Sequence, residues 1–269
     1  MEIPSPEELV VKKLGEPRFN SPFILKERGA FVDEDDRILI SAKNKVNQEM
    51  LEKYGHLLGF EKAGPRRKIF FDPKDTTIGI VTCGGLCPGL NDVIRSVTLA
   101  AHNNYGVRKV LGFRYGYKGL TRRGARPIEL TDSMVDGIQE SAGTFLGSSR
   151  GPQDPDEIID VLLEYGVNIL FTVGGDGTLH GAEKIAEAAI RRNLEISVVG
   201  IPKTIDNDIC WTSTSFGFYT AVEQAKLAVH AAHAEAKGAE NGIGLVKLMG
   251  RDSGFIASTA VRASGVANF

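Results

Sequence analysis

Apolar residues follow two alternating patterns along most of the chain, and both patterns begin near Thr77. Short apolar runs rich in β-branched residues predict strands, at 77–83, 107–113, 168–175, 196–202 and 242–250. Between these runs, apolar residues at helical spacing predict helices, at 91–104, 133–139, 156–166, 178–193, 215–237 and from 253 onward. Residues 1–75 lack this regularity and predict only some strand, near 38–41 and 68–71.

The alternation of strands with helices predicts the fold class. Strands joined by helices form parallel βαβ units, and strands that are apolar throughout indicate a sheet covered on both faces. We therefore expect an α/β protein with a Rossmann-like parallel sheet and helices on both faces. We also expect an N-terminal extension at 1–75, the main α/β domain at 76–210, and the start of a second, smaller α/β domain at 211–269.

Composition and charge exclude several classes of function. The chain has 32 basic and 34 acidic residues and a net charge of -2, so it offers no broad basic surface for nucleic acid. No apolar run reaches the ~18 residues that a membrane-spanning helix needs, so no membrane contact is expected. The N-terminus lacks the apolar core of a secretory signal, and an odd number of cysteines, three, suits a reducing compartment. We expect a cytoplasmic protein.

Three segments rich in Gly, Asp and Thr follow predicted strands, at 84–91, 174–178 and 202–208, and we expect them at one edge of the sheet. Glycines in the first let phosphate oxygens approach backbone N–H groups at a helix N-terminus. A tight turn that needs positive φ angles is the alternative. In the second segment, Asp176 lies between glycines and near Thr178. This arrangement suits binding of a Mg²⁺ ion that bridges phosphates. The alternative is that Asp176 caps the N-terminus of the following helix.

The third segment carries two carboxylates, Asp206 and Asp208. A hydroxyl that attacks a phosphate benefits from a carboxylate that accepts its proton, so one of these residues could act as a general base. The alternative is that both carboxylates belong to a solvated turn without a catalytic role. Arg150, after a Gly/Ser-rich loop, either clamps a phosphate or lies on the surface, and Arg251 ends a predicted strand. Because independent loops rarely converge on phosphate chemistry, the three segments together favour a phosphoryl-transfer site.

Five motifs, taken in order, resemble those of the 6-phosphofructokinases. They are VTCGGLCPGLNDVIR, GTFLGSSRG, GGDGT, PKTIDND and KLMGRDSG, between Thr77 and the end of the chain. PKTIDND followed by MGR is highly specific, whereas GGDGT also occurs in NAD kinases and lipid kinases. The N-terminal extension ends in GPRRKIFFDP and resembles the ATP-dependent branch found in plants and trypanosomatids.

The resemblance implies transfer of the γ-phosphoryl group of ATP to the 1-hydroxyl of fructose 6-phosphate, a step of glycolysis, with Mg²⁺ as cofactor. It implies an allosteric homo-oligomer, a dimer or tetramer, in which 76–210 binds ATP and 211–269 begins the sugar-phosphate domain. The implied ATP contacts are Gly85, Arg150, Gly151, Gly175, Asp176, Gly177 and Thr178, with Asp176 on Mg²⁺. The implied catalytic residues are Asp206 as base, assisted by Asp208, with Thr204 and Arg251. The implied sugar-phosphate contacts are Thr204, Ile205, Asp206, Met249, Gly250 and Arg251.

Two positions bear on the phosphoryl donor, Gly177 and Lys203. Pyrophosphate-using relatives typically carry GGDD with PKTIDND, bacterial ATP users carry GGDG with PGTIDND, and this chain combines GGDG with PKTIDND. A carboxylate at position 177 would crowd and repel the α-phosphate region of ATP, whereas Lys203 need not exclude ATP. We therefore expect ATP. The alternatives are a pyrophosphate-dependent phosphofructokinase, an NAD kinase-type enzyme, and a nucleotide-binding, non-catalytic fragment or regulatory subunit.

The chain departs from the family pattern in three places. Leu86 stands where the family commonly has Asp, and Asn241 with Gly242 stands where many bacterial members place a phosphate-binding Arg from a neighbouring subunit. The family's later sugar-phosphate residues, a Glu, two arginines and a His, would follow Phe269. We therefore expect a fragment with the donor site, the base and only part of the acceptor site, and we expect residues 1–269 alone to be inactive.

Overall fold

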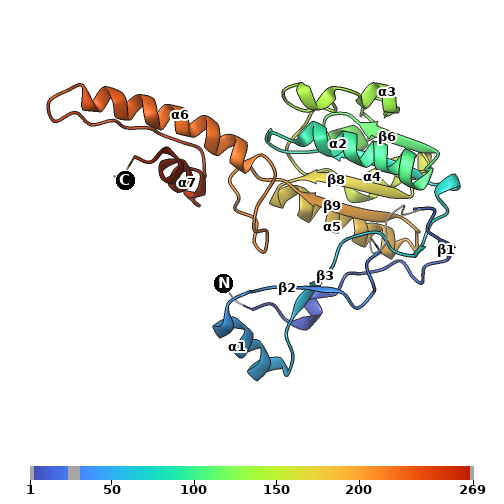
Figure 1. Ribbon diagram of the computed structural model, residues 1–269. Helices are drawn as coiled ribbons and strands as arrows, with labels where there is room; N and C mark the ends of the chain where they lie inside the picture. The colour runs from blue at the N-terminus through green and yellow to red at the C-terminus, as the bar shows by residue number, and fades with distance from the viewer. Residues whose placement is uncertain (1–2, 24–30, 267–269) are drawn as a thin grey trace. The chain divides into compact units, whose positions relative to one another are not determined.

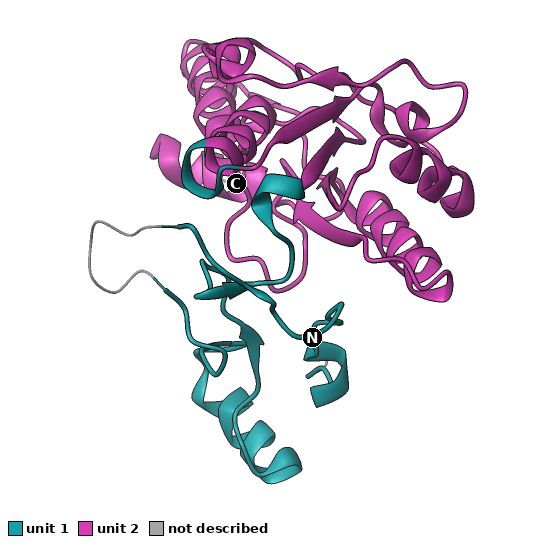
Figure 2. Cartoon of the chain, turned by 90° about the vertical axis from the view of Figure 1, so that its right-hand side faces the viewer, with its two compact units in different colours: residues 1–75, 103–106 teal, residues 76–102, 107–269 magenta. Residues whose placement is uncertain are grey.

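The computed structural model describes residues 3–23 and 31–266, so the expectation placed on the last residues, Ala267 to Phe269, lies outside the described part. The chain divides into two compact units, residues 1–75 with 103–106, and residues 76–102 with 107–269 (Figure 2). The expected domain boundary between residues 210 and 211 stays a prediction. No helix in the described ranges is both long enough and apolar enough to cross a membrane.

The first unit contains two short antiparallel strand pairs and one α-helix. Strand β1 (Phe19–Asn20) pairs with β4 (Lys68–Ile69), and β2 (Arg37–Leu39) pairs with β3 (Gly59–Glu61). The strands predicted near 38–41 and 68–71 are thus confirmed. Two 3₁₀ turns complete the unit, at Pro6–Leu9 and Pro73–Asp75. The sequence analysis missed helix α1 (Asn44–Tyr54), because this fully described helix is mostly polar and Met50 is its one buried residue.

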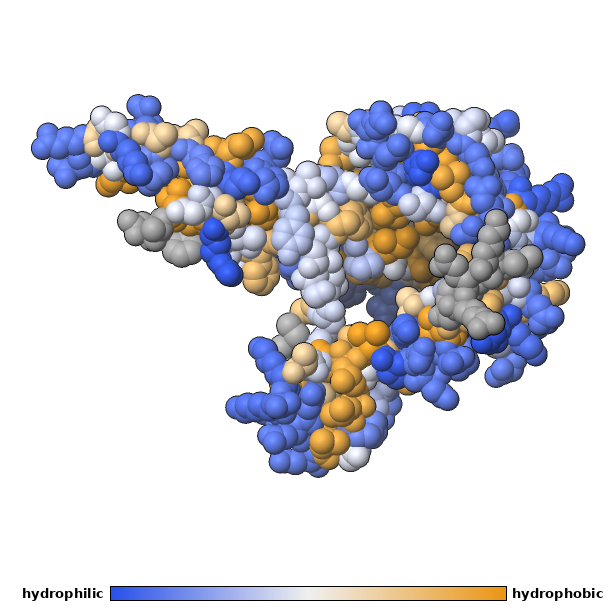
Figure 3. Space-filling model, in the orientation of Figure 1, coloured by the Kyte–Doolittle hydropathy of each residue, from blue (hydrophilic) through white to orange (hydrophobic). Residues whose placement is uncertain are grey.

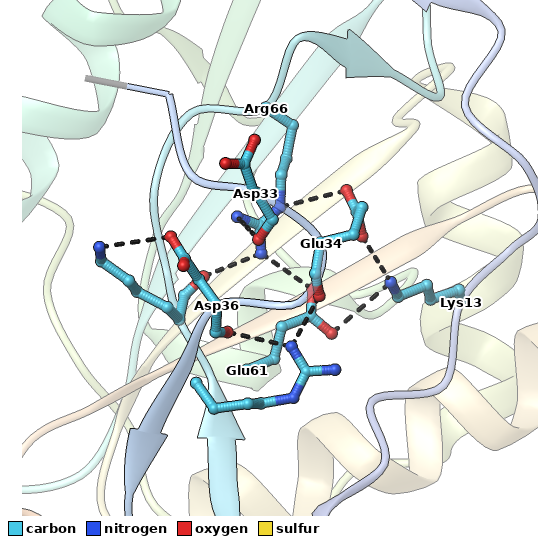
Figure 4. A network of polar contacts seen from close by, with 8 residues as sticks. Lys13, Asp33, Glu34, Asp36, Glu61 and Arg66 are labelled. Atoms are coloured by element: carbon cyan, nitrogen blue, oxygen red, sulfur yellow. Dashed lines mark hydrogen bonds and ion pairs between the residues drawn. The ribbon is translucent and has the colours of Figure 1, made fainter. Parts of the chain in front are cut away.

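A network of charged side chains holds the first unit together (Figure 4). Lys13 Nζ lies 3.1 Å from Glu34 and 3.6 Å from Glu61, and Arg66 Nη2 lies 3.1 Å from Glu61. Burial acts to raise the pKa of Glu61, but the hydrogen bond from Arg66 and the charge of Lys13 outweigh it and lower that pKa. Exposed ion pairs contribute only about 0–1 kcal/mol each, so the exposed Lys13–Glu34 pair should stabilise the unit less than the partly buried Arg66–Glu61 pair.

The second unit is built on a five-stranded sheet in the order β7-β6-β5-β8-β9 (Figure 1). The strands are β5 (Thr77–Thr82), β6 (Lys109–Phe113), β7 (Ile128–Glu129), β8 (Ile169–Gly174) and β9 (Ser197–Pro202). Four of these strands are parallel, which confirms the predicted fold class. The edge strand β7 is antiparallel to β6, and this was not predicted. A parallel connection needs a crossover, usually an α-helix, and here only the 3₁₀ turn Gly116–Leu120 intervenes.

Helices cover both faces of this sheet, as predicted. Leu170 of β8 packs in a core cluster with α4 (Pro155–Glu164) and α5 (Asp176–Arg191). Val173 lies an odd number of residues after Leu170 on the same strand, so its side chain points to the opposite face of the sheet. There it packs with Leu90 of α2 (Leu90–Leu99). A π-helical turn follows α2, at Ala100–Tyr105. The single helix predicted at 133–139 is wrong, because Gly137 adopts φ 79° and separates α3 (Asp132–Val135) from the 3₁₀ turn Ile138–Glu140.

The C-terminal part of the second unit is a pair of helices, α6 (Phe218–Lys237) and α7 (Phe255–Ser264), packed through Phe218, Val222 and Ile256. Both helices were predicted, but the strand predicted at 242–250 is wrong. That segment lies against α6, since a Cβ on Gly244 would come within 2.7 Å of the Ala232 carbonyl oxygen. It pairs with no described strand, and its side chains Ile243 and Leu245 are 92% and 94% exposed. Figure 3 shows hydrophobic surface among the hydrophilic side chains over α6 and α7.

Candidate active site

One cavity of about 550 Å³ lies at the carboxyl ends of β5, β8 and β9. Its wall includes Gly84 and Gly85 after β5, residues 175–178 after β8, and Lys203 after β9. The structure therefore brings the three predicted segments to one edge of the sheet. Strand β5 lies between β6 and β8, so the order in which the chain adds strands to the sheet reverses direction at β5. Ligand sites of open α/β sheets lie at such a reversal, at the carboxyl ends of the strands.

All seven residues expected to contact the nucleotide line this cavity, namely Gly85, Arg150, Gly151, Gly175, Asp176, Gly177 and Thr178. Two cationic side chains approach the first segment from other loops. A Cβ placed on Gly85 would lie 3.7 Å from Arg150 Nη2, and one on Gly84 would lie 4.0 Å from Lys203 Nζ. Gly84 adopts φ 81°, a conformation that side chains rarely tolerate, so the alternative interpretation of this glycine, a tight turn that needs a positive φ angle, is confirmed, and phosphate binding stays a prediction.

Helix α5 begins directly at the cavity wall. Gly175 is its N-cap, and the amides of Thr178 and Leu179 donate hydrogen bonds to the Gly175 carbonyl oxygen. Asp176 is the first helical residue and does not cap the helix, which removes the alternative explanation of this carboxylate as a cap. The N-terminus of a helix carries a partial positive charge and backbone N–H donors, so this wall of the cavity suits an anionic ligand.

The segment after β9 is a closed, internally hydrogen-bonded turn. The Thr204 hydroxyl donates to Asp208 at 2.5 Å and accepts from the Asp206 amide at 3.1 Å. Asn207 adopts φ 57° and its side chain accepts from the Ser215 amide at 2.7 Å. This turn is not a solvated one, because Lys203, Thr204 and Asp206 are each less than a tenth exposed.

Asp206 differs from Asp208 in its surroundings. Asp208 accepts hydrogen bonds from Thr204 and from Arg251, at 2.5 and 3.1 Å. Asp206 Oδ1 is buried and finds no hydrogen-bond partner among the described residues. Burial raises the pKa of Asp206, and repulsion from Asp208 raises it further, while Arg251 and Lys203 act in the opposite direction. The buried Oδ1 of Asp206 therefore has no donor among the described residues to stabilise its negative charge.

Arg251 connects the second and third segments. Its Nη1 lies 3.1 Å from Asp208 and 3.8 Å from Asp176, and it also lines the cavity. The residue adopts φ 49° directly after Gly250 at φ 147°. Left-handed backbone in a non-glycine residue costs of order 1–3 kcal/mol and persists where surrounding contacts hold it, often at functional sites. The guanidinium is thus placed beside both loop carboxylates.

The remaining predicted site residues lie outside the cavity wall. Thr204, Ile205 and Asp206 lie just beyond Lys203, whereas Met249 is 64% exposed and precedes Gly250 on the segment beside α6. The cavity therefore gathers the expected donor residues. Of the expected acceptor residues, Arg251 lines the cavity, Thr204 and Asp206 are buried beyond Lys203, and Met249 is exposed.

The sequence analysis missed Tyr117, which is buried in the wall of the cavity. A signal was present, since RYGYKGL follows the predicted strand at 107–113 and so ends at the same sheet edge. His180 also lines the cavity, and its Nδ1 lies 3.0 Å from the Asp176 carbonyl oxygen.

The raised pKa of Asp206 makes a prediction about stability. An Asp whose pKa is higher in the folded than in the unfolded protein destabilises the fold when ionised, and this penalty vanishes below its unfolded pKa, about 3.9. We therefore expect Asp206→Asn to raise the melting temperature at pH 7, with the difference shrinking toward pH 4. Asp208→Asn is the matched control and should lower it, because Asp208 is hydrogen-bonded. A lower melting temperature of the Asp206 variant at pH 7 would contradict this reasoning.

A doubly wound sheet with glycine-rich loops around a cavity at its carboxyl edge defines a class of ligand-binding α/β proteins. Within this class, the family model for phosphofructokinase matches residues 77–269. The ATP-dependent 6-phosphofructokinase of Trypanosoma brucei brucei is 52% identical over 266 residues, which cover 97% of this chain and 54% of that protein. The chain therefore belongs to the phosphofructokinase family.

Other relatives agree with this result. ATP-dependent 6-phosphofructokinase 4, chloroplastic, of Arabidopsis thaliana is 45% identical over 250 residues, covering 92% of this chain and 46% of that protein. The crystal structure of Pichia pastoris phosphofructokinase in the T-state superposes with a TM-score of 0.60 at 25% identity, covering 78% of this chain and 24% of that one. The chain spans about half the length of the curated relatives it matches.

Proposed function

We propose that the intact protein is an ATP-dependent 6-phosphofructokinase that transfers the γ-phosphoryl group of ATP to the 1-hydroxyl of fructose 6-phosphate. Membership of the family and the names of the trypanosomatid and plant relatives support this proposal. The observation that carries it is Asp206, whose buried Oδ1 finds no hydrogen-bond partner among the described residues, while Arg251 and Lys203 lie close enough to act on its pKa.

The cavity supports the donor half of the reaction. Gly175, Asp176 and Gly177 at the start of α5 would donate backbone N–H hydrogen bonds to the phosphates, as would Gly85 and Gly151, and Thr178 would line the same wall. Arg150 and Lys203 approach the first segment and would balance the charge of the phosphates. A Cβ on Gly177 would meet nothing within 4 Å, so the space beside this residue is open, as ATP requires.

The turn after β9 supports the acceptor half. The oxygen of the sugar 1-hydroxyl would form a bond to the γ-phosphorus while the bond from that phosphorus to the bridging oxygen of ATP breaks, leaving ADP. The hydroxyl proton would pass to Asp206, and Asp208 would help through its contact with Arg251. Arg251 would stabilise the charge of the transferring group, and Thr204, Ile205, Met249 and Gly250 would contact the sugar phosphate.

The residues present fit a magnesium ion that is held mainly by the donor. Among the described residues, no group of three or more His, Cys, Asp or Glu side chains could hold a metal by itself. Mg²⁺ commonly takes one or two carboxylates and completes its shell with substrate phosphates and water. Asp176, exposed at the cavity wall, would supply that carboxylate, and the ion would neutralise charge on the phosphates.

A donor comparison tests the proposed function. The intact protein is assayed with fructose 6-phosphate and either Mg-ATP or Mg-pyrophosphate, and fructose 1,6-bisphosphate is measured. We expect product with ATP, little with pyrophosphate, and none when a chelator removes Mg²⁺. Preferential use of pyrophosphate would support the pyrophosphate-dependent alternative, and no product with either donor would contradict the proposal.

The remaining expectations stay predictions that rest on the resemblance. They are a place in glycolysis and in the cytoplasm, a homo-oligomer under allosteric control, and the inactivity of residues 1–269 by themselves.

A further inference from the structure

The turn after β6 is packed tightly between the loops of the site. Tyr115 and Gly116 adopt φ 64° and 63°, two successive left-handed residues that reverse the chain at the end of β6. A Cβ on Gly116 would come within 2.6 Å of Ser149 Oγ and 3.3 Å of Cys83 Sγ. This turn therefore touches both the first glycine-rich segment and the loop that carries Arg150.

Tyr117, the next residue, extends from this turn to the first turns of α5, which form another part of the cavity wall. Its hydroxyl donates a hydrogen bond of 2.7 Å to the Thr178 carbonyl oxygen in the first turn of α5. Its ring lies against Gly181, where a Cβ would come within 2.6 Å of a ring carbon. Residues 178 and 181 lie on one face of α5, so Tyr117 contacts the start of that helix at two points.

The side chain has the properties that such a contact needs. Tyr117 is 7% exposed, and burial strongly raises the pKa of its hydroxyl, so the hydroxyl remains a neutral donor at every working pH. Cys83, beside the same turn, is also buried, and burial raises its pKa to about 11, so it is a thiol that packs and not a reactive thiolate.

We propose that Tyr117 is a positioning residue that fixes the N-terminal turn of α5 relative to the 83–85 and 149–151 loops and thereby prepares the cavity for nucleotide phosphates. This inference rests on the proposed function. Donors that are held in place before the ligand arrives lose less freedom on binding, so ordering of this turn adds to affinity. Among the described residues, the Tyr117 hydroxyl bonds to Thr178, whereas Thr204 in the turn after β9 bonds to Asp208 and Ser215. Binding of the sugar phosphate should therefore not depend on the tyrosine hydroxyl.

The test is Tyr117→Phe in the intact protein, which keeps the ring against Gly181 and removes the hydrogen bond to Thr178. ATP binding is measured by calorimetry, and the KM values for ATP and for fructose 6-phosphate are measured separately. We expect ATP binding to weaken about three- to tenfold, the range for loss of one buried neutral hydrogen bond, with the KM for fructose 6-phosphate unchanged. Tyr165→Phe is the matched control, because Tyr165 packs edge-to-face on Phe113 in the same core and lines no part of the cavity.

A second variant tests the same contact from the side of the helix. Gly181→Ala would displace the tyrosine ring, and with it the hydroxyl, without removing the hydroxyl group, and should also weaken ATP binding. If both variants act through one contact, their effects will not add in the double variant. A lower melting temperature with unchanged ATP binding in Tyr117→Phe would overturn the inference, since Tyr117 would then support only the fold. If the unaltered protein bound no ATP, the proposed function would fail as well, so the two failures are distinguishable.

Discussion

Asp206→Asn should lower kcat in the intact protein by about 10²–10⁴-fold, the usual contribution of a positioned general base. Asparagine keeps the shape of the side chain and one hydrogen-bonding oxygen but cannot accept the hydroxyl proton. Asp206 lies outside the wall of the nucleotide cavity, so the affinity for ATP should stay near that of the unaltered protein. Steady-state kinetics with ATP and fructose 6-phosphate, together with direct measurement of ATP binding, check both parts.

Asp208→Asn is the control for this experiment, because the two carboxylates are two residues apart and carry the same charge. Asp208 already accepts hydrogen bonds from Thr204 and Arg251, so it orients those groups and has less capacity to take a proton. Its substitution should lower kcat less than that of Asp206. An inactive Asp208 variant beside a fully active Asp206 variant would show that the two roles are reversed.

Gly177→Asp should lower kcat/KM for ATP by at least ~10-fold, because like charges a few ångströms apart repel strongly in a partly enclosed cavity. The structure allows this test to be interpreted. A Cβ at position 177 would meet no atom within 4 Å, so the fold can accept a side chain there and the effect is electrostatic. The variant should also gain activity with pyrophosphate, a smaller donor that does not reach past this position.

Gly177→Ala separates charge from size at this position. Alanine fits the same open space and suits a helix better than glycine, so the variant should fold and use ATP nearly as well as the unaltered protein. The donor argument would fail if Gly177→Asp used ATP as efficiently as Gly177→Ala. Equal losses in both variants would instead indicate that the site cannot hold any side chain at position 177.

Much of the fold could be predicted because apolar periodicity is local information. Strands β5, β6, β8 and β9 and the long helices α5 and α6 all follow from the spacing of apolar residues within a few turns. The errors lie where a segment is mostly polar, or where its conformation depends on a distant part of the chain. Helix α1 buries only Met50 along its described length, and the apolar segment at 242–250 lies along α6 without a strand to pair with.

The same division applies to the site. The glycine-rich and carboxylate-bearing segments could be recognised along the chain, and parallel strands place their carboxyl ends at one edge, so the meeting of the segments was predictable. The roles of individual residues in these segments were less predictable. Asn91 belongs to the first glycine-rich motif, yet it is buried, and its side chain binds the Ile138 and Ser141 carbonyl oxygens and the Phe145 amide. It therefore holds a neighbouring loop in place.

Residue types and their order along the chain are sufficient to indicate the family, the sheet and the segments that border the cavity. Three features depend on packing between distant segments: the Oδ1 of Asp206, which has no hydrogen-bond partner in the described part of the chain, the contact of Arg251 with Asp176 and Asp208, and the hydrogen bond from Tyr117 to Thr178. The physical reason is that helix and strand formation depend on near neighbours, whereas burial and hydrogen bonding of a side chain depend on which distant backbone folds against it.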